Sequence, residues 1–139
     1  MKTENCNFLF VYGTLRKNVD HPMSDILQKY KTNTVSGTFN GKLFDVGSYP
    51  AAIISDDPSS QVHGELYTLK EPDALFQHLD HYEGFDVHSP SKSLYLRKQV
   101  TITTDKAAEL SAWTYLYNRS VDFLTPIPGG DYLAYLKSK

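Results

Sequence analysis

Hydrophobic residues along this chain fall into short runs and alternations that predict strands, and wider spacings that predict helices. Residues 8–12 form an unbroken apolar and aromatic run, which is typical of a strand buried on both faces. Residues 94–103 alternate clearly between apolar and polar positions and predict a half-buried strand. The remaining predicted strands span residues 35–44, 51–54, 62–69 and 112–117.

Helical spacing occurs in two longer segments and one short one. The first segment has an apolar stripe at i, i+3, i+4 and i+7, made by Met23, Ile26, Leu27 and Tyr30. A second helix is predicted to begin near Pro72 and to turn four side chains inward, namely Leu75, Phe76, Leu79 and Tyr82. A glycine turn at residues 129–130 leads into a short closing helix that reaches residue 136.

The order of these elements predicts an α+β fold. Strands and helices do not alternate as they do in a doubly wound parallel sheet. Glycines inside the predicted strands, at Gly37, Gly41 and Gly64, indicate sharp bends. We therefore expect a small, strongly curved mixed β-barrel with helices packed outside. Residues 1–139 contain no repeat and no linker, so a single domain is expected.

Composition excludes several classes of function. A formal net charge of −2 gives no electrostatic reason to expect a nucleic acid or a membrane surface as partner. The apolar runs are too short to cross a bilayer, and the first residues lack the apolar core of a signal peptide, so a cytoplasmic location is expected. Cys6 is the only cysteine and lies in a polar arm, which favours a bystander thiol over a nucleophile.

The first strand ends in a turn that could bind an anion. Gly13 lacks a Cβ, so backbone N–H groups there can approach a ligand closely. Thr14 adds a hydroxyl and Arg16 a fixed positive charge, a combination suited to a carboxylate. The alternative is that Gly13 only closes a turn.

The second predicted helix ends in an unfavourably placed carboxylate. Gly84 stops the helix, so Glu83 lies at its C-terminal end, where the helix dipole disfavours negative charge by about 0.3–1 kcal/mol. Glu83 also follows Leu79 at i+4 and therefore faces inward with the apolar stripe. Burial and the dipole should both raise its pKa and suit it to proton transfer. Alternatively, Glu83 frays into solvent or forms a structural ion pair with Arg97.

Two residues of the strand over residues 94–103 could assist. Tyr95 and Arg97 point to the same face, where they could hold Glu83 or an anionic group. The alternative is a solvated strand face with an aromatic anchor. The histidines of the second helix, His78 and His81, lack convergent further donors, so no metal site is expected.

Together these segments resemble the gamma-glutamyl cyclotransferase-like superfamily. The first strand ends in Tyr12-Gly13-Thr14-Leu15, the helix ends in Leu79-Asp80-x-Tyr82-Glu83-Gly84, and the next strand carries Tyr95-x-Arg97. Tyr49-Pro50 and Val62-x-Gly64-Glu65-Leu66-Tyr67 also fit. The resemblance runs from about residue 8 to residue 117. Its form is closest to the branch that includes gamma-glutamylamine cyclotransferases.

This resemblance implies an enzyme that turns a free γ-glutamyl group into 5-oxoproline and releases an amine or amino acid, without metal or organic cofactor. It implies that Glu83 is the general acid/base. Backbone N–H groups around Gly13, Thr14 and Leu15 would hold the substrate carboxylate or the developing oxyanion. Tyr12, Tyr95, Arg97 and Tyr117 would complete the substrate site.

A different class of function uses the same pocket. A binding module could sequester or sense a small γ-glutamyl metabolite without turnover, but such a protein has no need to retain Glu83. The leaving amine and the oligomeric state stay open. Residues 86–93 form an insert-like stretch that we expect to make a loop beside the pocket.

Overall fold

The computed structural model describes residues 6–13, 22–47 and 49–138. Its strands are β1 (Phe8–Val11), β2 (Lys31–Asp45), β3 (Pro50–Ile54), β4 (Gln61–Leu69), β5 (Tyr95–Thr104), β6 (Glu109–Tyr117) and β7 (Thr125–Pro126). Its helices are α1 (Pro22–Tyr30), α2 (Pro72–Glu83), the short 3₁₀ helix η2 (Pro90–Lys92) and α3 (Tyr132–Ser138).

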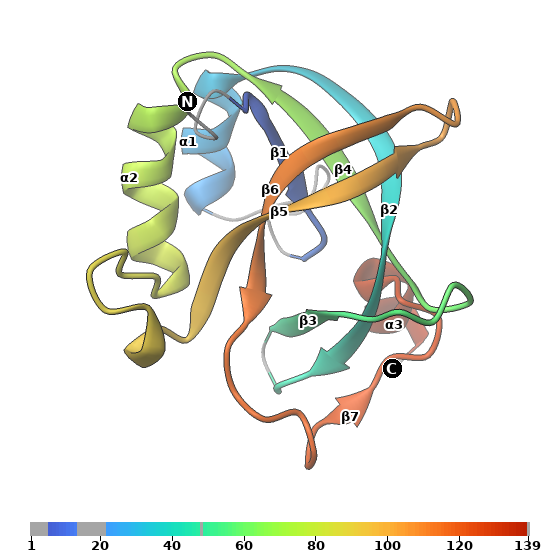
Figure 1. Cartoon of the computed structure of the whole chain (residues 1–139). Helices are drawn as coiled ribbons and strands as arrows, with labels where there is room; N and C mark the ends of the chain where they lie inside the picture. Colours follow the sequence, from blue (N-terminus) through green and yellow to red (C-terminus); the bar gives the residue numbers. More distant parts are fainter. Residues whose placement is uncertain (1–5, 14–21, 48, 139) are drawn as a thin grey trace.

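Five strands close into the mixed barrel that the strand glycines predicted (Figure 1). The order is β2-β4-β1-β6-β5, and β5 returns to pair with β2 at Gly37↔Thr104 and Thr38↔Thr103. β1 and β6 run parallel, whereas the other neighbours are antiparallel. The long strand β2 continues beyond the barrel and pairs there with β3 and with β7.

Glycine is required at the tightest approach of two strands. At Gly64 on β4, an added Cβ would lie 2.2 Å from the Val11 carbonyl oxygen and 2.7 Å from Cζ of Phe10. Gly37 on β2 pairs directly with Gly64. Neither β4 nor β2 therefore carries a side chain at this pair, and the glycine on β4 allows β1 to approach closely.

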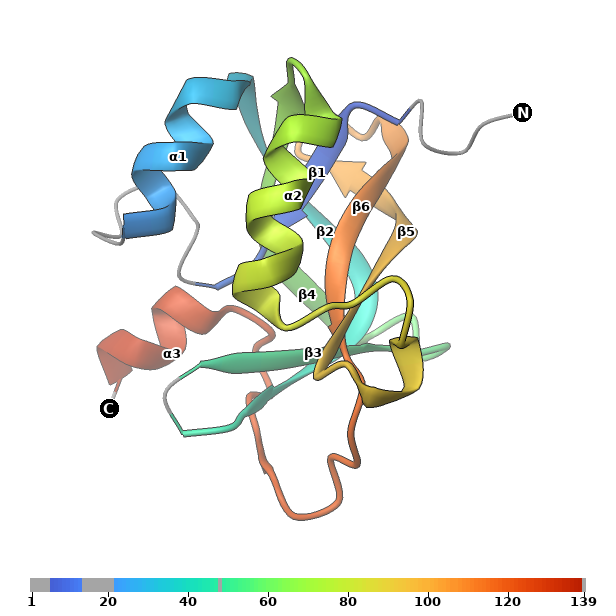
Figure 2. The same ribbon diagram turned by 90° about the vertical axis from the view of Figure 1, so that its left-hand side faces the viewer.

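Two hydrophobic cores stabilise the fold. One fills the barrel and includes Phe10, Phe39 and Leu66, with the rings of Phe10 and Phe39 packed edge to face. The other lies between the barrel wall and the helices, and includes Tyr67 and Leu79. Figure 2 shows α1 and α2 side by side over β1, while α3 lies near β3. This arrangement confirms helices packed outside a barrel.

The helix α2 departs from its predicted packing at one position. It begins at Pro72 as predicted and buries Leu75, Phe76 and Leu79, but Tyr82 is 41 % exposed. The prediction that Tyr82 turns inward was therefore wrong, because the last turn of α2 reaches the rim of a cavity instead of the core. The strand β7 and the 3₁₀ helix were not predicted.

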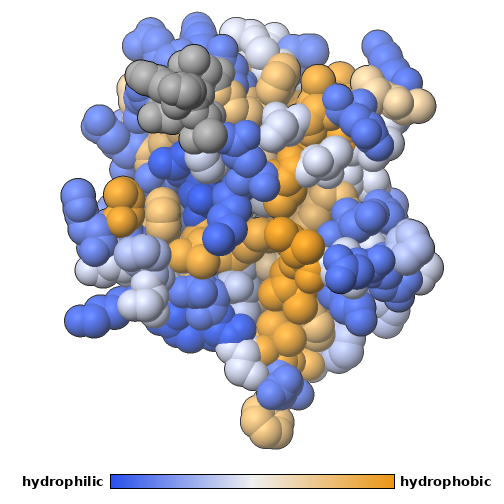
Figure 3. Space-filling view, in the orientation of Figure 1, coloured by the Kyte–Doolittle hydropathy of each residue, from blue (hydrophilic) through white to orange (hydrophobic). Residues whose placement is uncertain are grey.

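The face of the molecule seen in Figure 3 is mostly polar. Figure 3 shows mainly hydrophilic residues on one face, with a hydrophobic strip running down its middle. Among the described residues, the large hydrophobic side chains that stay exposed are Ile54, Tyr82, Val87, Phe123 and Leu136. In the part of the chain that the structure describes, no helix is long and apolar enough to span a membrane.

Candidate active site

The end of β1 opens into a cavity of about 260 Å³, close to the lower limit of ordinary small-molecule sites. Its wall comes from β1 and the residues after it, from the segment around Pro50, from the end of α2, and from β5 and β6. The lining residues are Leu9, Phe10, Val11, Tyr12, Gly13, Tyr49, Pro50, Tyr82, Glu83, Leu94, Tyr95, Thr114 and Tyr115.

The parallel pairing of β1 with β6 explains why the cavity lies at the end of β1. The two strands pair in register at Leu9↔Trp113. Beyond that point side chains bridge them: the Thr114 hydroxyl donates to the Phe10 carbonyl at 3.0 Å, and the Tyr12 hydroxyl donates to the Tyr115 carbonyl at 2.5 Å. The carboxyl ends of two parallel strands therefore border one hollow, a common position for a ligand.

Glu83 reaches this hollow from the last turn of α2. Gly84 ends the helix with φ 72°, and the Phe85 N–H donates to the Asp80 carbonyl at 2.9 Å, as in a Schellman motif. The Glu83 side chain is half-buried and makes no hydrogen bond or ion pair with the described residues. Burial, and secondly the charge of Asp80, raise the pKa of Glu83 to about 7.

Three tyrosine side chains lie around the Glu83 carboxylate, and each of their hydroxyl groups already donates a hydrogen bond to another residue. Tyr12 donates to the Tyr115 carbonyl, Tyr95 to the Pro50 carbonyl at 2.6 Å, and Tyr115 to Oδ1 of Asp80 at 2.6 Å. Burial, and to a lesser extent the charge of Glu83, raise the pKa of each of these phenols. These hydroxyls therefore stay protonated. The Tyr12 oxygen is also hydrogen-bonded to the Ala52 backbone, so the Tyr95 and Tyr115 oxygens are the ones that can accept a further hydrogen bond.

Gly13 lines the cavity beside Pro50. A Cβ on Gly13 would lie 2.8 Å from Cγ of Pro50, so glycine allows the end of the first strand to approach the opposite wall. Thr14 and Leu15, the other two residues expected to supply backbone N–H groups, lie outside the described residues, as does Arg16.

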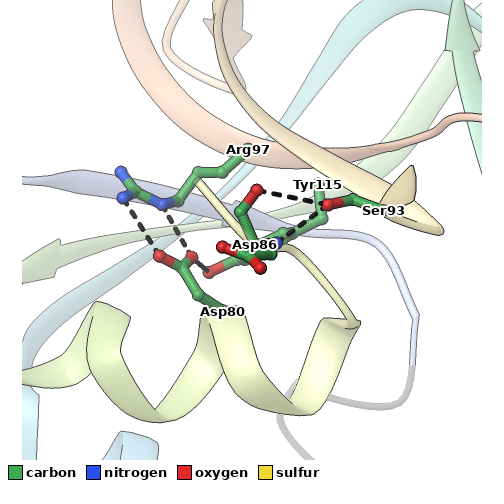
Figure 4. Close-up of polar contacts among 5 residues, drawn as sticks. All are labelled: Asp80, Asp86, Ser93, Arg97 and Tyr115. Atoms are coloured by element: carbon green, nitrogen blue, oxygen red, sulfur yellow. Dashed lines mark hydrogen bonds and ion pairs between the residues drawn. The ribbon is translucent and has the colours of Figure 1, made fainter. Parts of the chain in front are cut away.

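Arg97 and Tyr117 do not line the cavity. Arg97 is bound to Asp80 on α2, with Nε 2.8 Å from Oδ1 and Nη2 3.2 Å from Oδ2 (Figure 4). The proposed ion pair between Arg97 and Glu83 is therefore not formed, because Asp80, one turn earlier, takes the guanidinium. Tyr117 packs its ring edge to face on Tyr95, with centroids 5.5 Å apart, and so supports the wall from behind.

Several lining residues were missed by the reasoning from spacing. Tyr115 lies directly opposite Arg97 in the β5–β6 register, so its position followed only from knowing which strands pair. Tyr49 and Pro50 reach the cavity from the point where the chain passes from β2 into β3. The sequence feature that could have identified them is the match of Tyr49-Pro50 to the family pattern.

The loop of residues 86–93 lies next to the cavity wall but does not line it. The buried Ser93 hydroxyl accepts from the Asp86 N–H at 2.8 Å, as Figure 4 shows, and Arg119 donates to the Ser93 carbonyl at 2.7 Å. These contacts fasten the loop onto the end of β6. Within the described residues, no group of three His, Cys, Asp or Glu side chains could hold a metal ion.

A small mixed barrel whose aromatic cavity holds a half-buried carboxylate places this protein in the class of proteins with a small-molecule site. Comparison with known families is more specific: residues 9–134 match the family model described as gamma-glutamyl cyclotransferase, AIG2-like. The chain belongs to this family.

Individual relatives agree in sequence and in fold. The gamma-glutamylcyclotransferase family protein YtfP of Escherichia coli is 32 % identical over 134 residues, which cover 90 % of this chain and 95 % of YtfP. The crystal structure of YkqA from Bacillus subtilis superposes with a TM-score of 0.70 at 27 % identity, and covers 96 % of this chain but 43 % of YkqA. An AIG2-like protein from Mus musculus superposes with a TM-score of 0.68 at 19 % identity, covering 91 % of this chain and 87 % of that protein.

Proposed function

We propose that this protein is a cyclotransferase that converts a free γ-glutamyl group on an amine or amino acid into 5-oxoproline. The observation that carries the proposal is the Glu83 carboxylate, which faces the cavity without a hydrogen-bonding partner among the described residues and has a pKa of about 7. A group with that pKa can both accept and return a proton near neutral pH. Family membership supplies the class of substrate.

The reaction closes a ring within the substrate. The substrate α-ammonium gives one proton to the Glu83 carboxylate, and the freed nitrogen then forms a bond to the γ-carbonyl carbon. The bond from that carbon to the leaving nitrogen breaks as Glu83 returns the proton to it. The ring nitrogen then gives one of its two protons to the departing amine and keeps the other as the lactam N–H, so atoms and charges balance without an oxidant, a metal or an organic cofactor.

The cavity wall suits the ammonium end of such a substrate. Glu83 offers a negative charge, and the hydroxyl oxygens of Tyr95 and Tyr115 offer acceptors whose own protons are used elsewhere. An ammonium group has only donors and is attracted to aromatic faces. Holding it beside Glu83 would bring amine and carbonyl together and remove much of the entropic barrier to cyclisation.

The substrate carboxylate would then lie toward Gly13, at the end of β1. Backbone N–H groups at Gly13, Thr14 and Leu15 are the proposed donors, both for this carboxylate and for the oxyanion that develops at the γ-carbonyl. Tyr117 would act indirectly by supporting Tyr95. We assign Arg97 no direct contact with the substrate.

The test is release of 5-oxoproline from a panel of γ-glutamyl amines, γ-glutamyl amino acids and glutathione. Wild type, Glu83→Gln and the matched control Glu109→Gln, which changes an exposed glutamate at the start of β6, are compared. Turnover by wild type and Glu109→Gln that disappears in Glu83→Gln is expected, and the productive substrate names the leaving group. Turnover retained in Glu83→Gln would contradict its role. Absence of turnover with every substrate, but with saturable binding, would favour a binding module.

A further inference from the structure

Asp80 is held by side chains from two neighbouring strands. Arg97 on β5 donates two hydrogen bonds to its carboxylate, and Tyr115 on β6 donates a third at 2.6 Å (Figure 4). Arg97 and Tyr115 are directly opposite each other in the β5–β6 register. The last turn of α2 is therefore fastened to the sheet at Asp80, one turn before Glu83.

Aromatic rings fix the orientation of the guanidinium. The Arg97 guanidinium carbon lies 4.2 Å from the ring centroid of Phe76 and 4.6 Å from that of Trp113. The Arg97 side chain is 18 % exposed and that of Asp80 15 %, so water screens the ion pair incompletely. A bidentate pair in such surroundings has one strongly preferred geometry.

Asp80 and Glu83 lie three positions apart on α2, a spacing that brings side chains to the same side of a helix. If Asp80 lost its charge, Glu83 would be the next carboxylate along that side that the guanidinium could bind. A glutamate bound in this way would be held as an anion and could no longer exchange its proton freely.

We propose that Asp80 is a positioning residue for Glu83, which fixes the last turn of α2 against β5 and β6 and keeps the Arg97 guanidinium away from the Glu83 carboxylate. This inference rests on the proposed function of Glu83. It goes further by giving the Arg97–Asp80–Tyr115 network a role in the chemistry, although none of the three donates to or accepts from Glu83 in this structure.

The electrostatics around Glu83 agree with this role. Burial and then the Asp80 charge raise the pKa of Glu83, and the Arg97 guanidinium is paired with Asp80 instead of with Glu83. The titratable and charged groups that face this region come from every surrounding element, namely Asp80 and Tyr82 of α2, Tyr12 after β1, Tyr49 before β3, Tyr95 and Arg97 of β5, and Tyr115 of β6.

The experiment titrates Glu83 itself. NMR of protein with ¹³C-labelled glutamate carboxyls gives the midpoint, and the Glu83 signal is assigned by its absence from Glu83→Gln. Asp80→Asn and Arg97→Met are compared with Asp73→Asn, which removes an exposed carboxylate from the first turn of the same helix. The pH profile of kcat/KM is measured on the same variants.

We expect the two changes to shift the titration in opposite directions. Asp80→Asn should lower the midpoint from about 7 toward the ordinary value of 4.5, and Arg97→Met should raise it because Asp80 then lacks its counter-charge. Asp73→Asn should leave it in place. Well-folded Asp80→Asn and Arg97→Met proteins with an unchanged midpoint, or with shifts of the same sign, would overturn the proposal.

A further variant tests whether Asp80 keeps Arg97 from Glu83. Asp80→Asn combined with Arg97→Met leaves no guanidinium to bind Glu83, so its midpoint should lie above that of Asp80→Asn, and a midpoint equal to that of Asp80→Asn would overturn the proposal. If either single variant folds poorly, the direction expected for the other still tests the proposal. The two proposals can fail separately. A wild-type midpoint near 7 without turnover refutes only the cyclotransferase function. Turnover that is lost in Glu83→Gln, with an Asp80→Asn midpoint equal to that of wild type, refutes only the positioning role.

Discussion

The hydroxyl of Tyr12 donates a hydrogen bond to the main-chain carbonyl of Tyr115, joining the ends of two parallel strands at the mouth of the cavity. Tyr12 is 6 % exposed and Tyr115 5 %, so water cannot readily replace this bond. The contact fixes one wall of the cavity relative to the other. It also engages the phenolic proton, and the Ala52 backbone forms a second hydrogen bond with the same hydroxyl.

Tyr12→Phe should lower the free energy of unfolding by about 1 kcal/mol, because the Tyr115 carbonyl loses a buried donor while the ring still packs. Urea unfolding measures the loss. The matched control is Tyr30→Phe on α1, a half-buried tyrosine with no hydroxyl hydrogen bond to the described residues. Equal stabilities of the two variants would show that the Tyr12 bond contributes nothing.

Glu83→Gln should make the protein more stable at high pH. The folded-state pKa of about 7 exceeds the ordinary 4.5, so the folded state binds the proton more tightly and stability falls as pH rises between these values. The full difference corresponds to about 3 kcal/mol, which screening at the half-buried carboxylate reduces to about 1–2 kcal/mol. Unfolding of both proteins at about pH 5 and pH 8 measures this. Glu83→Gln that is less stable than wild type at the higher pH would indicate a stabilising ion pair instead.

The pH dependence of turnover should report the same group. Because the proposed mechanism starts with the Glu83 carboxylate accepting a proton, kcat/KM should rise with pH through about 7 and level off above it. Below that value the rate should fall about tenfold per pH unit, as expected for a single ionisation. A profile that is flat from about pH 5 to pH 8 would exclude Glu83 as the base.

Two glycine substitutions should differ in cost for different reasons. Gly84→Ala places a side chain at φ 72° with its closest neighbour 3.6 Å away, so it should cost only the left-handed backbone penalty, about 1–2 kcal/mol. Gly64→Ala forces a Cβ to 2.2 Å from the Val11 carbonyl and should cost considerably more, with loss of β1–β4 pairing. Thermal unfolding ranks them. A Gly64→Ala protein as stable as Gly84→Ala would contradict the tight approach.

The pattern of hydrophobic and polar residues predicted most of the helices and strands, and it also predicted that Glu83 faces inward. Pro72 indicated the start of α2, and helical spacing together with Gly84 indicated the inward direction of Glu83, since each depends only on nearby residues. Alternation identified β5, and the strand glycines predicted closure of the barrel. These are features that a few neighbouring residues determine.

Features that depend on pairing between distant segments did not follow from the sequence. Spacing could not decide whether Arg97 binds Asp80 or Glu83, because both carboxylates lie on the last turns of one helix. The exposure of Tyr82 depends on where the barrel ends beneath α2. The wall position of Tyr115 depends on β6 lying beside β5, and the short strand β7 is set by its partner β2.

The pairing of Leu9 with Trp113 has a consequence for synthesis of the protein on the ribosome. The cavity is built from the beginning of the chain and from a strand near its end, so a nascent chain that still lacks β6 has no complete pocket. During translation β1 must wait, with one of its edges uncovered, until the last barrel strand emerges. Assembly of the cavity is thus a late event, and it coincides with closure of the barrel itself.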